Sequence, residues 1–498
     1  MRLRNCVLAF FAAALMVAAG GAFAAKKSRG PAAREPLAVT VTRILSQQHI
    51  RSDEASVVVQ AVDEDAAAFE LNELTPRNPA STIKLVTTWG ALESLGPAFT
   101  WKTEIYAVGS VSQGVLNGDL VIKGFGDPFL VTEEFWKLLN AVRAAGIRDI
   151  RGNLVLDTTY FDLPPEDPGA FDDRPDHPYN VLPNALLLNF HTVRFEVSAG
   201  SQGGARIQMD PLPANLQIAN RVSVVDGPCR GNYGVSFAVD DPGERSRIIL
   251  GGQIPRNCGS YGFARAVLTP ETFALGVFQT LWSQLGGSFE GGVRAGRVPQ
   301  GARLLLAWRS RTLADVLRGL NKFSNNTMAR HFLLTAGAHK FGAPATADKG
   351  SRAIKEILAG HGLDPTAMEI ANGSGLARDT RVTARLLADV LIAAWRSPYM
   401  PEFVASLPIA GVDGTMRRRF KNAPEAGRMH VKTGHLKGVS AIAGYVHGAD
   451  HRTYVVVSIV NRAQGSWGGE VLHDTVLRRV YADSRMAASR KATADRSP

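Results

Sequence analysis

The chain has 498 residues, of which 45% are hydrophobic and 20% charged, and Lys and Arg exceed Asp and Glu by 11. This composition is typical of a globular protein of about three domains, and it excludes a disordered chain, a collagen and a coiled coil. The positive excess favours anionic surroundings or serves solubility alone. No nucleic-acid partner is expected, because the sequence contains no RNP-like aromatic segment or zinc-finger spacing.

The N-terminal segment predicts export. Met1–Asn5 carries two arginines and no acid, and Cys6–Ala19 is a run of 14 small and apolar residues that ends near Ala22-Phe23-Ala24. A basic start, a short apolar middle and small residues before a cut predict a signal peptide over residues 1–24. Fourteen residues are short for a membrane span, which favours a cleaved signal peptide over the alternative of an uncleaved anchor. Lys26–Arg34 is expected to be a flexible basic leader, and its association with a membrane or cell wall stays open.

The first predicted elements are two strands and a helix. Ala55–Val62 and Ala67–Asn72 read as strands with an acidic turn between them. Pro79–Leu95 has helical spacing, with proline in its first turn. From about residue 100 to 300, short alternating stretches separated by Gly, Pro and Asp predict a β-rich region, with one helix near Glu271–Leu285.

This middle region also contains two cysteines. Cys229 and Cys258 are 29 positions apart, and each lies in a loop rich in Gly, Pro and Asn. In an oxidising compartment such a pair predicts one disulfide, and two unpaired thiols are the alternative.

The last third of the chain returns to helices and then to strands. Helical patterns cover Leu313–Phe323, Ala329–Ala338, Ala353–His361 and Val382–Ser397, strands cover Met429–Thr433, Ser440–Val446 and Thr453–Val460, and a final helix covers Gly468–Tyr481. The simplest arrangement is one mixed α/β (α+β) domain interrupted by a β-rich insertion. Its terminal strands are expected to join the early hairpin in one antiparallel sheet flanked by helices.

Three short motifs lie in three different contexts. Ser81-Thr82-Ile83-Lys84 opens the first helix, Ser324-Asn325-Asn326 lies between two helices, and Lys432-Thr433-Gly434 ends a strand. Each motif alone arises by chance in a chain of this length. Their order and contexts together indicate one catalytic site.

The residue types suit nucleophilic catalysis. A serine hydroxyl needs a base, and Lys84 lies one helical turn from Ser81. A lysine acts as a base only when it is neutral, which requires burial or a nearby positive charge such as Lys432. Ser324 is then expected to bridge the two ammonium groups and pass a proton to the leaving amine.

The remaining motif residues are expected to bind substrate. The Asn326 amide suits a substrate peptide group, and Thr433 with Lys432 suits a terminal carboxylate. The backbone N–H groups of Ser81 and His435 are candidates for an oxyanion hole. Each residue taken singly also has a structural interpretation. Ser81 would be a helix cap and Lys84 a solvated lysine, Ser324–Asn326 would form a turn, and Lys432 would be an exposed strand residue. The ring of His435 would only lie next to the site.

With these motifs the sequence resembles the penicillin-binding proteins, specifically the low-molecular-mass class C D-alanyl-D-alanine carboxypeptidase/endopeptidases with a large insertion after the first motif. Ser81 and Ser324 are 243 residues apart, which is similar to that family and far longer than in class A β-lactamases. Further similar stretches are Gly124–Pro128, Asn372–Leu376, Ser406–Gly411 with Asp413–Thr415, and Lys432–Val439.

The resemblance implies a division of the chain into domains. A β-lactamase/transpeptidase-like domain would cover 36–100 and 303–483, insert domain II 101–180 and 263–302, and insert domain III 181–262, followed by a flexible tail over 484–498. The Cys229–Cys258 disulfide would lie in insert domain III.

The resemblance also implies a periplasmic enzyme that hydrolyses the D-Ala–D-Ala bond of peptidoglycan stem peptides and cross-links ending in D-Ala. β-Lactams would be covalent inhibitors, and no metal or other cofactor is expected. By motif, Ser81 would be the acylated nucleophile, Lys84 its base and Ser324 the proton relay, and Asn326 and Lys432–Gly434 would hold substrate. The balance between carboxypeptidase and endopeptidase activity and the oligomeric state stay open. The alternatives are a related serine esterase or β-lactamase and a non-catalytic wall-binding protein.

The sequence departs from the family pattern at two positions. Asn325 replaces the usual Asp of the second motif, which removes a negative charge near the site and bears on how the adjacent helices are positioned. Ala377 replaces the usual Ser after Leu376. In addition, Asp172 and Asp173 lie in a loop similar to an acidic loop of the family that approaches the amine of the substrate's diamino acid.

Overall fold

The N- and C-terminal parts of the chain share one five-stranded sheet. The computed structural model describes residues 35–200, 203–229, 234–241, 246–463 and 468–482, so the predicted signal peptide, leader and tail lie outside the described residues. The strand order is β16 (Met429–Leu436), β17 (Val439–His447), β18 (Thr453–Asn461), β1 (Ala55–Ala61) and β2 (Phe69–Leu71). Every neighbouring pair is antiparallel, which confirms the predicted sheet.

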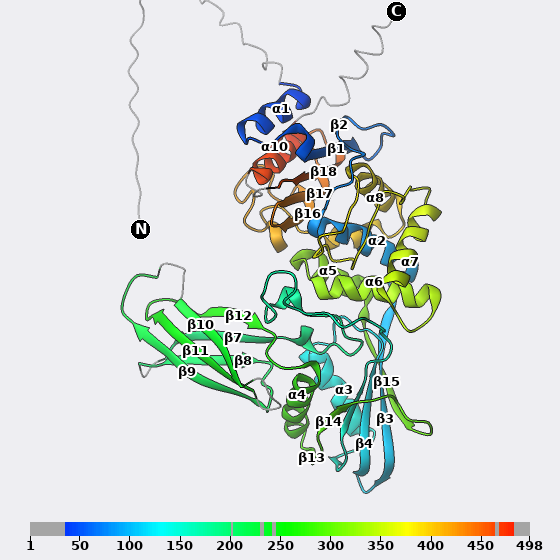
Figure 1. Ribbon diagram of the computed structural model, residues 1–498, viewed down its shortest axis with the longest axis vertical. Coiled ribbons are helices and arrows are strands. Elements are labelled where there is room, and N and C mark those ends of the chain that lie inside the picture. The colour runs from blue at the N-terminus through cyan, green and yellow to red at the C-terminus, as the bar shows by residue number, and fades with distance from the viewer. Residues whose placement is uncertain (1–34, 201–202, 230–233, 242–245, 464–467, 483–498) are drawn as a thin grey trace, which may run out of the picture.

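Helices cover both faces of this sheet (Figure 1). On one face, α1 (Leu37–Gln47) and α10 (Gly469–Ala482) pack on side chains such as Val57 and Ile442. On the other face, α2 (Lys84–Leu95) and α8 (Ala384–Arg396) pack with Val58 and Val457. Because side chains alternate along a strand, the valines of β1 contribute to the hydrophobic cores on both faces of the sheet.

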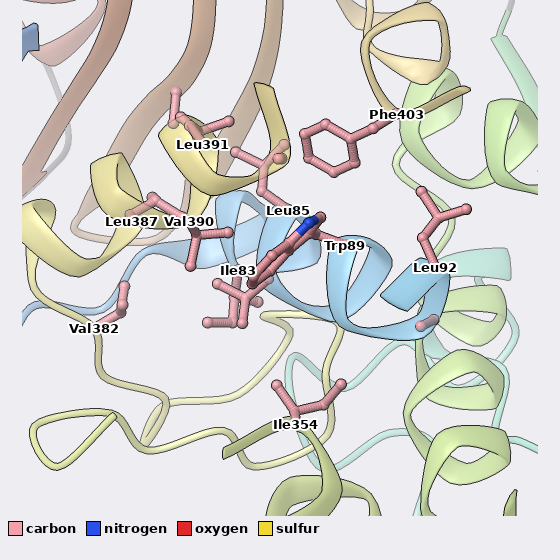
Figure 2. Packing of buried hydrophobic residues seen from close by; sticks show 14 of the residues in the cluster. Ile83, Leu85, Trp89, Leu92, Ile354, Val382, Leu387, Val390, Leu391 and Phe403 are labelled. Atoms are coloured by element: carbon pink, nitrogen blue, oxygen red, sulfur yellow. The ribbon is translucent and has the colours of Figure 1, made fainter. Parts of the chain in front are cut away.

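The buried helix α2 is at the centre of the second core. Trp89 is 1% exposed, and it lies among side chains of α8 and Phe403 of α9 (Met400–Ser406) (Figure 2). Three more helices complete this layer, α5 (Leu313–Phe323), α6 (Asn326–Phe341) and α7 (Ala347–Gly360). The start of α2 is therefore held from several sides by rigid elements.

The insertion begins with a mixed seven-stranded sheet. The strands are β3 (Thr100–Ser112), β4 (Val115–Gly124), β5 (Asp149–Ile150), β6 (Leu154–Asp157), β13 (Ser288–Phe289), β14 (Val293–Ala295) and β15 (Arg303–Thr312). β15 begins at the expected start of the catalytic domain, yet its partner is β3 of the insertion. The chain thus leaves the insertion beside the point where it enters, next to α5.

The outer part of the insertion consists of two three-stranded sheets (Figure 1). They contain β7 (Val193–Ala199), β8 (Ala205–Asp210), β9 (Leu216–Val225), β10 (Gly234–Asp241), β11 (Ser246–Pro255) and β12 (Tyr261–Arg265). Cys229 and Cys258 form a disulfide here, as the sequence predicts. Two helices, α3 (Thr132–Ala144) and α4 (Pro270–Gln284), complete the core of the insertion. No helix among the described residues is long and apolar enough to span a membrane.

Two local features differ from the sequence predictions. The helix expected from Pro79 begins as a 3₁₀ turn, η2 (Ala80–Ile83), and becomes α-helical at Lys84. The β-rich region also contains α3, which was not predicted although Phe135, Leu138, Leu139 and Val142 repeat at helical spacing and are buried.

Candidate active site

Ser81 lies in the 3₁₀ turn η2, directly before α2. In 3₁₀ geometry residues three apart lie above one another, so the turn places Ser81 and Lys84 on the same face. Lys84 Nζ is 3.1 Å from Ser81 Oγ. Two glycines allow other segments to approach this turn closely. A Cβ on Gly375 would lie 2.0 Å from the Ala80 carbonyl oxygen, and a Cβ on Gly434 would lie 2.7 Å from the Pro79 carbonyl oxygen.

Lys84 is completely buried at the base of the site. Its Nζ is 2.7 Å from Asn326 Oδ1, and it also donates to the backbone carbonyl of Ser374. Burial first, and then the positive charge of Lys432, hold the pKa of Lys84 well below its usual value. A neutral amine has two N–H donors and one lone pair. The two carbonyl oxygens occupy both donors, which leaves the lone pair for the hydroxyl proton of Ser81.

Ser324 and Lys432 lie across the site from this pair. Ser324 ends α5 in the left-handed conformation, with φ 58° and ψ 37°. Lys432, on the edge strand β16, donates from Nζ to Ser324 Oγ at 2.8 Å and to the Thr433 carbonyl at 2.7 Å. Burial lowers the pKa of Lys432 to about 7. The three sequence motifs therefore meet around two buried amines.

Asn325, where the family pattern has Asp, caps a helix. Its Oδ1 accepts a hydrogen bond from the Met328 N–H at 2.9 Å at the start of α6. Asn and Asp serve this purpose about equally well, so the position keeps its structural role without the charge. The next residue, Asn326, points into the site, where its Oδ1 faces Lys84 and its Nδ2 donates to the Tyr179 carbonyl at 2.9 Å.

The outer end of the site is formed by β16 and a neighbouring loop. Thr433 Oγ1 lies 2.9 Å from Thr415 Oγ1, and His435 is exposed. The loop before Thr415 is fixed by Lys322, which donates from Nζ to Asp413 Oδ2 at 2.7 Å and to the Leu407 carbonyl at 2.6 Å. Because Lys322 precedes Ser324 by two residues, this ion pair links the second motif to the loop beside the third.

A loop of the insertion forms one wall of the site. Thr327 Oγ1 donates to the Val181 carbonyl at 3.0 Å, and Arg330 pairs with Glu166. Between this loop and the catalytic helices lies a cavity of about 200 Å³, lined by residues that include Asn326 and Ser374. The carboxylate of Asp172 accepts hydrogen bonds from Tyr179 and Asn180 within the loop, and Asp173 is exposed.

The structure thus brings Ser81, Lys84, Ser324, Asn326 and Lys432 into one cluster and places Thr433, Gly434 and His435 along its edge strand. Sequence reasoning did not assign three further groups, the carbonyls of Ser374 and Tyr179 and the hydroxyl of Thr415. Ser374 and Thr415 lie in stretches already recognised as similar to the family. Tyr179 carries no such signal, because it contributes only a backbone carbonyl.

Comparison with known proteins gives a consistent result. The profile of the D-Ala-D-Ala carboxypeptidase 3 (S13) family matches residues 37–475. A D-alanyl-D-alanine carboxypeptidase of Actinomadura sp. is 30% identical over 419 residues, which is 81% of this chain and 76% of the relative. The D-alanyl-D-alanine carboxypeptidase DacB of Haemophilus influenzae is 27% identical over 420 residues, 84% of this chain and 87% of the relative.

A solved structure supports the same relationship. The crystal structure of penicillin binding protein 4 from Haemophilus influenzae aligns with a TM-score of 0.71 at 26% identity, and the alignment covers 89% of this chain and 98% of that one. The same protein has also been solved in complex with a β-lactam, and that structure aligns with a TM-score of 0.68.

Proposed function

The chain belongs to the D-Ala-D-Ala carboxypeptidase 3 (S13) family, a family of serine peptidases, and on this premise we propose that it cleaves D-Ala–D-Ala in peptidoglycan stem peptides through an acyl-enzyme on Ser81. The observation that carries the proposal is the environment of Lys84. This amine is buried, faces two carbonyl acceptors and lies 3.1 Å from Ser81 Oγ, as a general base for that hydroxyl should.

In the acylation step, Ser81 Oγ attacks the carbonyl carbon of the penultimate D-Ala, and Lys84 takes the hydroxyl proton. The C–N bond then breaks. The proton that Lys84 took from Ser81 passes through Ser324 Oγ to the leaving amine, which leaves Lys84 neutral again, while Lys432 holds Ser324 Oγ by a hydrogen bond. In hydrolysis, Lys84 takes a proton from the attacking water and gives it to Ser81 Oγ as the ester bond breaks, which restores the free enzyme.

Substrate is held at three points in this proposal. The Asn326 side chain binds a peptide group of the substrate, and Thr433 with Lys432 binds the terminal carboxylate. The N–H groups of Ser81 and His435 stabilise the oxyanion. The close approach of Gly434 to Ser81 N, where a Cβ would lie at 3.0 Å, supports this pairing of turn and edge strand.

The same chemistry extends to cross-links and to β-lactams. A cross-link ending in D-Ala presents the same acyl group with a longer leaving amine, so endopeptidase activity needs no additional catalytic residue. The Haemophilus influenzae relative has been solved with a β-lactam, and we propose that β-lactams acylate Ser81 of this chain.

We also propose that the enzyme works in the periplasm. The signal-like segment over residues 1–24 and the Cys229–Cys258 disulfide support this location, because disulfides persist in oxidising compartments.

Incubation of the purified protein with a stem pentapeptide tests the activity. We expect release of free D-alanine, and no release from the Ser81→Ala variant. Steady turnover of a β-lactam or simple ester without D-alanine release would instead identify a related esterase or β-lactamase. Binding to sacculi without turnover of any of these compounds would identify a wall-binding protein.

A further inference from the structure

A basic segment follows the outer end of the site. Residues Arg417–Lys421 contain four cations in five positions, and they begin two residues after Thr415. Thr415 itself contacts Thr433 on the edge strand. The segment therefore borders the end of the site where the substrate carboxylate is proposed to bind.

The protein fixes this segment in place. Met416 and Phe420 are buried, at 0% and 6% exposure, and Phe420 adopts a φ of 62° that is unfavourable for a large side chain. Arg419 forms an ion pair with Asp474 of α10, and the Arg478 guanidinium lies 5.0 Å from the centre of the Phe420 ring. Because its apolar residues and Arg419 are held in place, the segment presents its other side chains from a fixed backbone.

The other cations of the segment remain available. Arg417, Arg418 and Lys421 are exposed, and within the described residues none of them has an ion-pair partner. The nearby acids are already engaged, because Asp413 pairs with Lys322, Asp474 with Arg419 and Glu425 with Arg478. An exposed patch of one sign next to a binding site attracts ligands of the opposite sign.

The two proposed substrates, pentapeptide and cross-link, differ on the leaving-group side of the scissile bond. In a pentapeptide the leaving group is a single D-alanine, which ends at the carboxylate near Thr433. In a cross-link the leaving amine belongs to a second stem peptide, which continues out of the site and carries further carboxylates. If the substrate carboxylate binds at Thr433, the second stem peptide leaves the site next to Thr415, which contacts Thr433.

We propose that Arg417, Arg418 and Lys421 bind the carboxylates of the second stem peptide, so that this surface favours cross-linked substrate over pentapeptide. The inference rests on the proposed function. An anionic lipid surface is the competing occupant. It fits less well, because Phe420 and the preceding Met416 are buried and interfacial binding uses exposed apolar side chains.

The test compares two triple variants of the mature protein. Arg417→Ala/Arg418→Ala/Lys421→Ala removes the proposed surface. Arg206→Ala/Arg221→Ala/Arg303→Ala removes the same charge from exposed arginines on strands of the insertion. For each variant, kcat/KM is measured on a purified cross-linked muropeptide dimer and on a pentapeptide monomer, at low and high salt.

We expect the first variant to lower the dimer-to-pentapeptide ratio of kcat/KM on the order of tenfold at low salt, because each exposed charge contact contributes modestly. The difference should shrink at high salt, where exposed charges are screened. The control variant should keep the wild-type ratio.

An unchanged ratio in the first variant, or an equal fall in the control, would overturn the inference. Binding of wild type and the first variant to phosphatidylglycerol vesicles is measured as well. An unchanged ratio together with lost vesicle binding would overturn the inference and assign the surface to lipid. If wild type cleaves the pentapeptide but not the dimer, this inference fails together with the proposed endopeptidase activity, and the carboxypeptidase activity stands. If it cleaves neither, the proposed function fails and the inference falls with it.

Discussion

At the scale of single residues, the proposed chemistry depends on keeping the Lys84 amine neutral. Desolvation does most of this, and Lys432 adds to it. Asn326 contributes by being an amide, because its Oδ1 accepts a hydrogen bond without supplying a negative charge.

Asn326→Asp tests that requirement. The new carboxylate would lie against Lys84 Nζ and raise the pKa of the amine, because an opposite charge favours the protonated form. We expect the acid limb of the pH profile for β-lactam acylation to move upward. At pH values below the limb, an upward move of about one pH unit lowers the rate about tenfold, and the rate recovers as the pH rises past the new limb. A lower rate with an unmoved limb would contradict the assignment of Lys84 as the base.

We expect Lys432 to set the alkaline limb of the pH profile. Its pKa is lowered to about 7 by burial, so the free enzyme loses this positive charge as the pH rises through that value. A neutral Lys432 no longer attracts the substrate carboxylate and holds Ser324 Oγ by a weaker hydrogen bond. We therefore expect kcat/KM for pentapeptide, which reports the free enzyme, to fall on the alkaline side from about pH 7. A flat profile up to about pH 9 would argue against this role.

At the scale of elements, the site depends on the close contact between η2 and β16. Gly434→Ala would place a methyl group 2.7 Å from the Pro79 carbonyl oxygen, a backbone atom that cannot rotate away. We expect β16 to shift and acylation by a β-lactam to slow about a hundredfold, since small displacements of catalytic groups are costly. Circular dichroism should remain that of wild type. A wild-type acylation rate would show that the contact is not needed.

The sequence predicts these elements better than it predicts their contacts. Leu313–Phe323 has the predicted bounds, and the predicted strands that form the central sheet all occur, because apolar periodicity reports directly on burial. The 3₁₀ start of the first helix was not predicted, because its i,i+3 spacing also fits an α-helix. The carbonyls of Ser374 and Tyr179 could not be predicted, since any residue carries a backbone carbonyl and only the tertiary fold decides where it points.

At the scale of the whole molecule, the insertion and the catalytic domain have their own main hydrophobic cores, and smaller mixed clusters join them. Cys258 belongs to the core of the insertion, whereas Trp89 and the sheet valines belong to the catalytic cores. The insertion still reaches the site through Tyr179 and Val181, which lie in a different segment from the disulfide.

Removing the disulfide should therefore affect stability more than chemistry. We expect Cys229→Ser/Cys258→Ser to lower the stability of the insertion by about 2–4 kcal/mol, the usual range for such a cross-link. β-Lactam acylation at about 25 °C should stay within about twofold of wild type, because the disulfide does not belong to the catalytic cores. Calorimetry measures the loss of stability, and the rate of β-lactam acylation measures the effect on the site. A large loss of acylation by folded protein would contradict the separation.

The most direct test of the account is to map a covalent β-lactam adduct by peptide mass spectrometry. We predict a single adduct on the peptide that contains Ser81 and none in folded Ser81→Ala protein. An adduct on another residue, equal labelling of the variant or no adduct in wild type would contradict the assignment of Ser81 as the nucleophile.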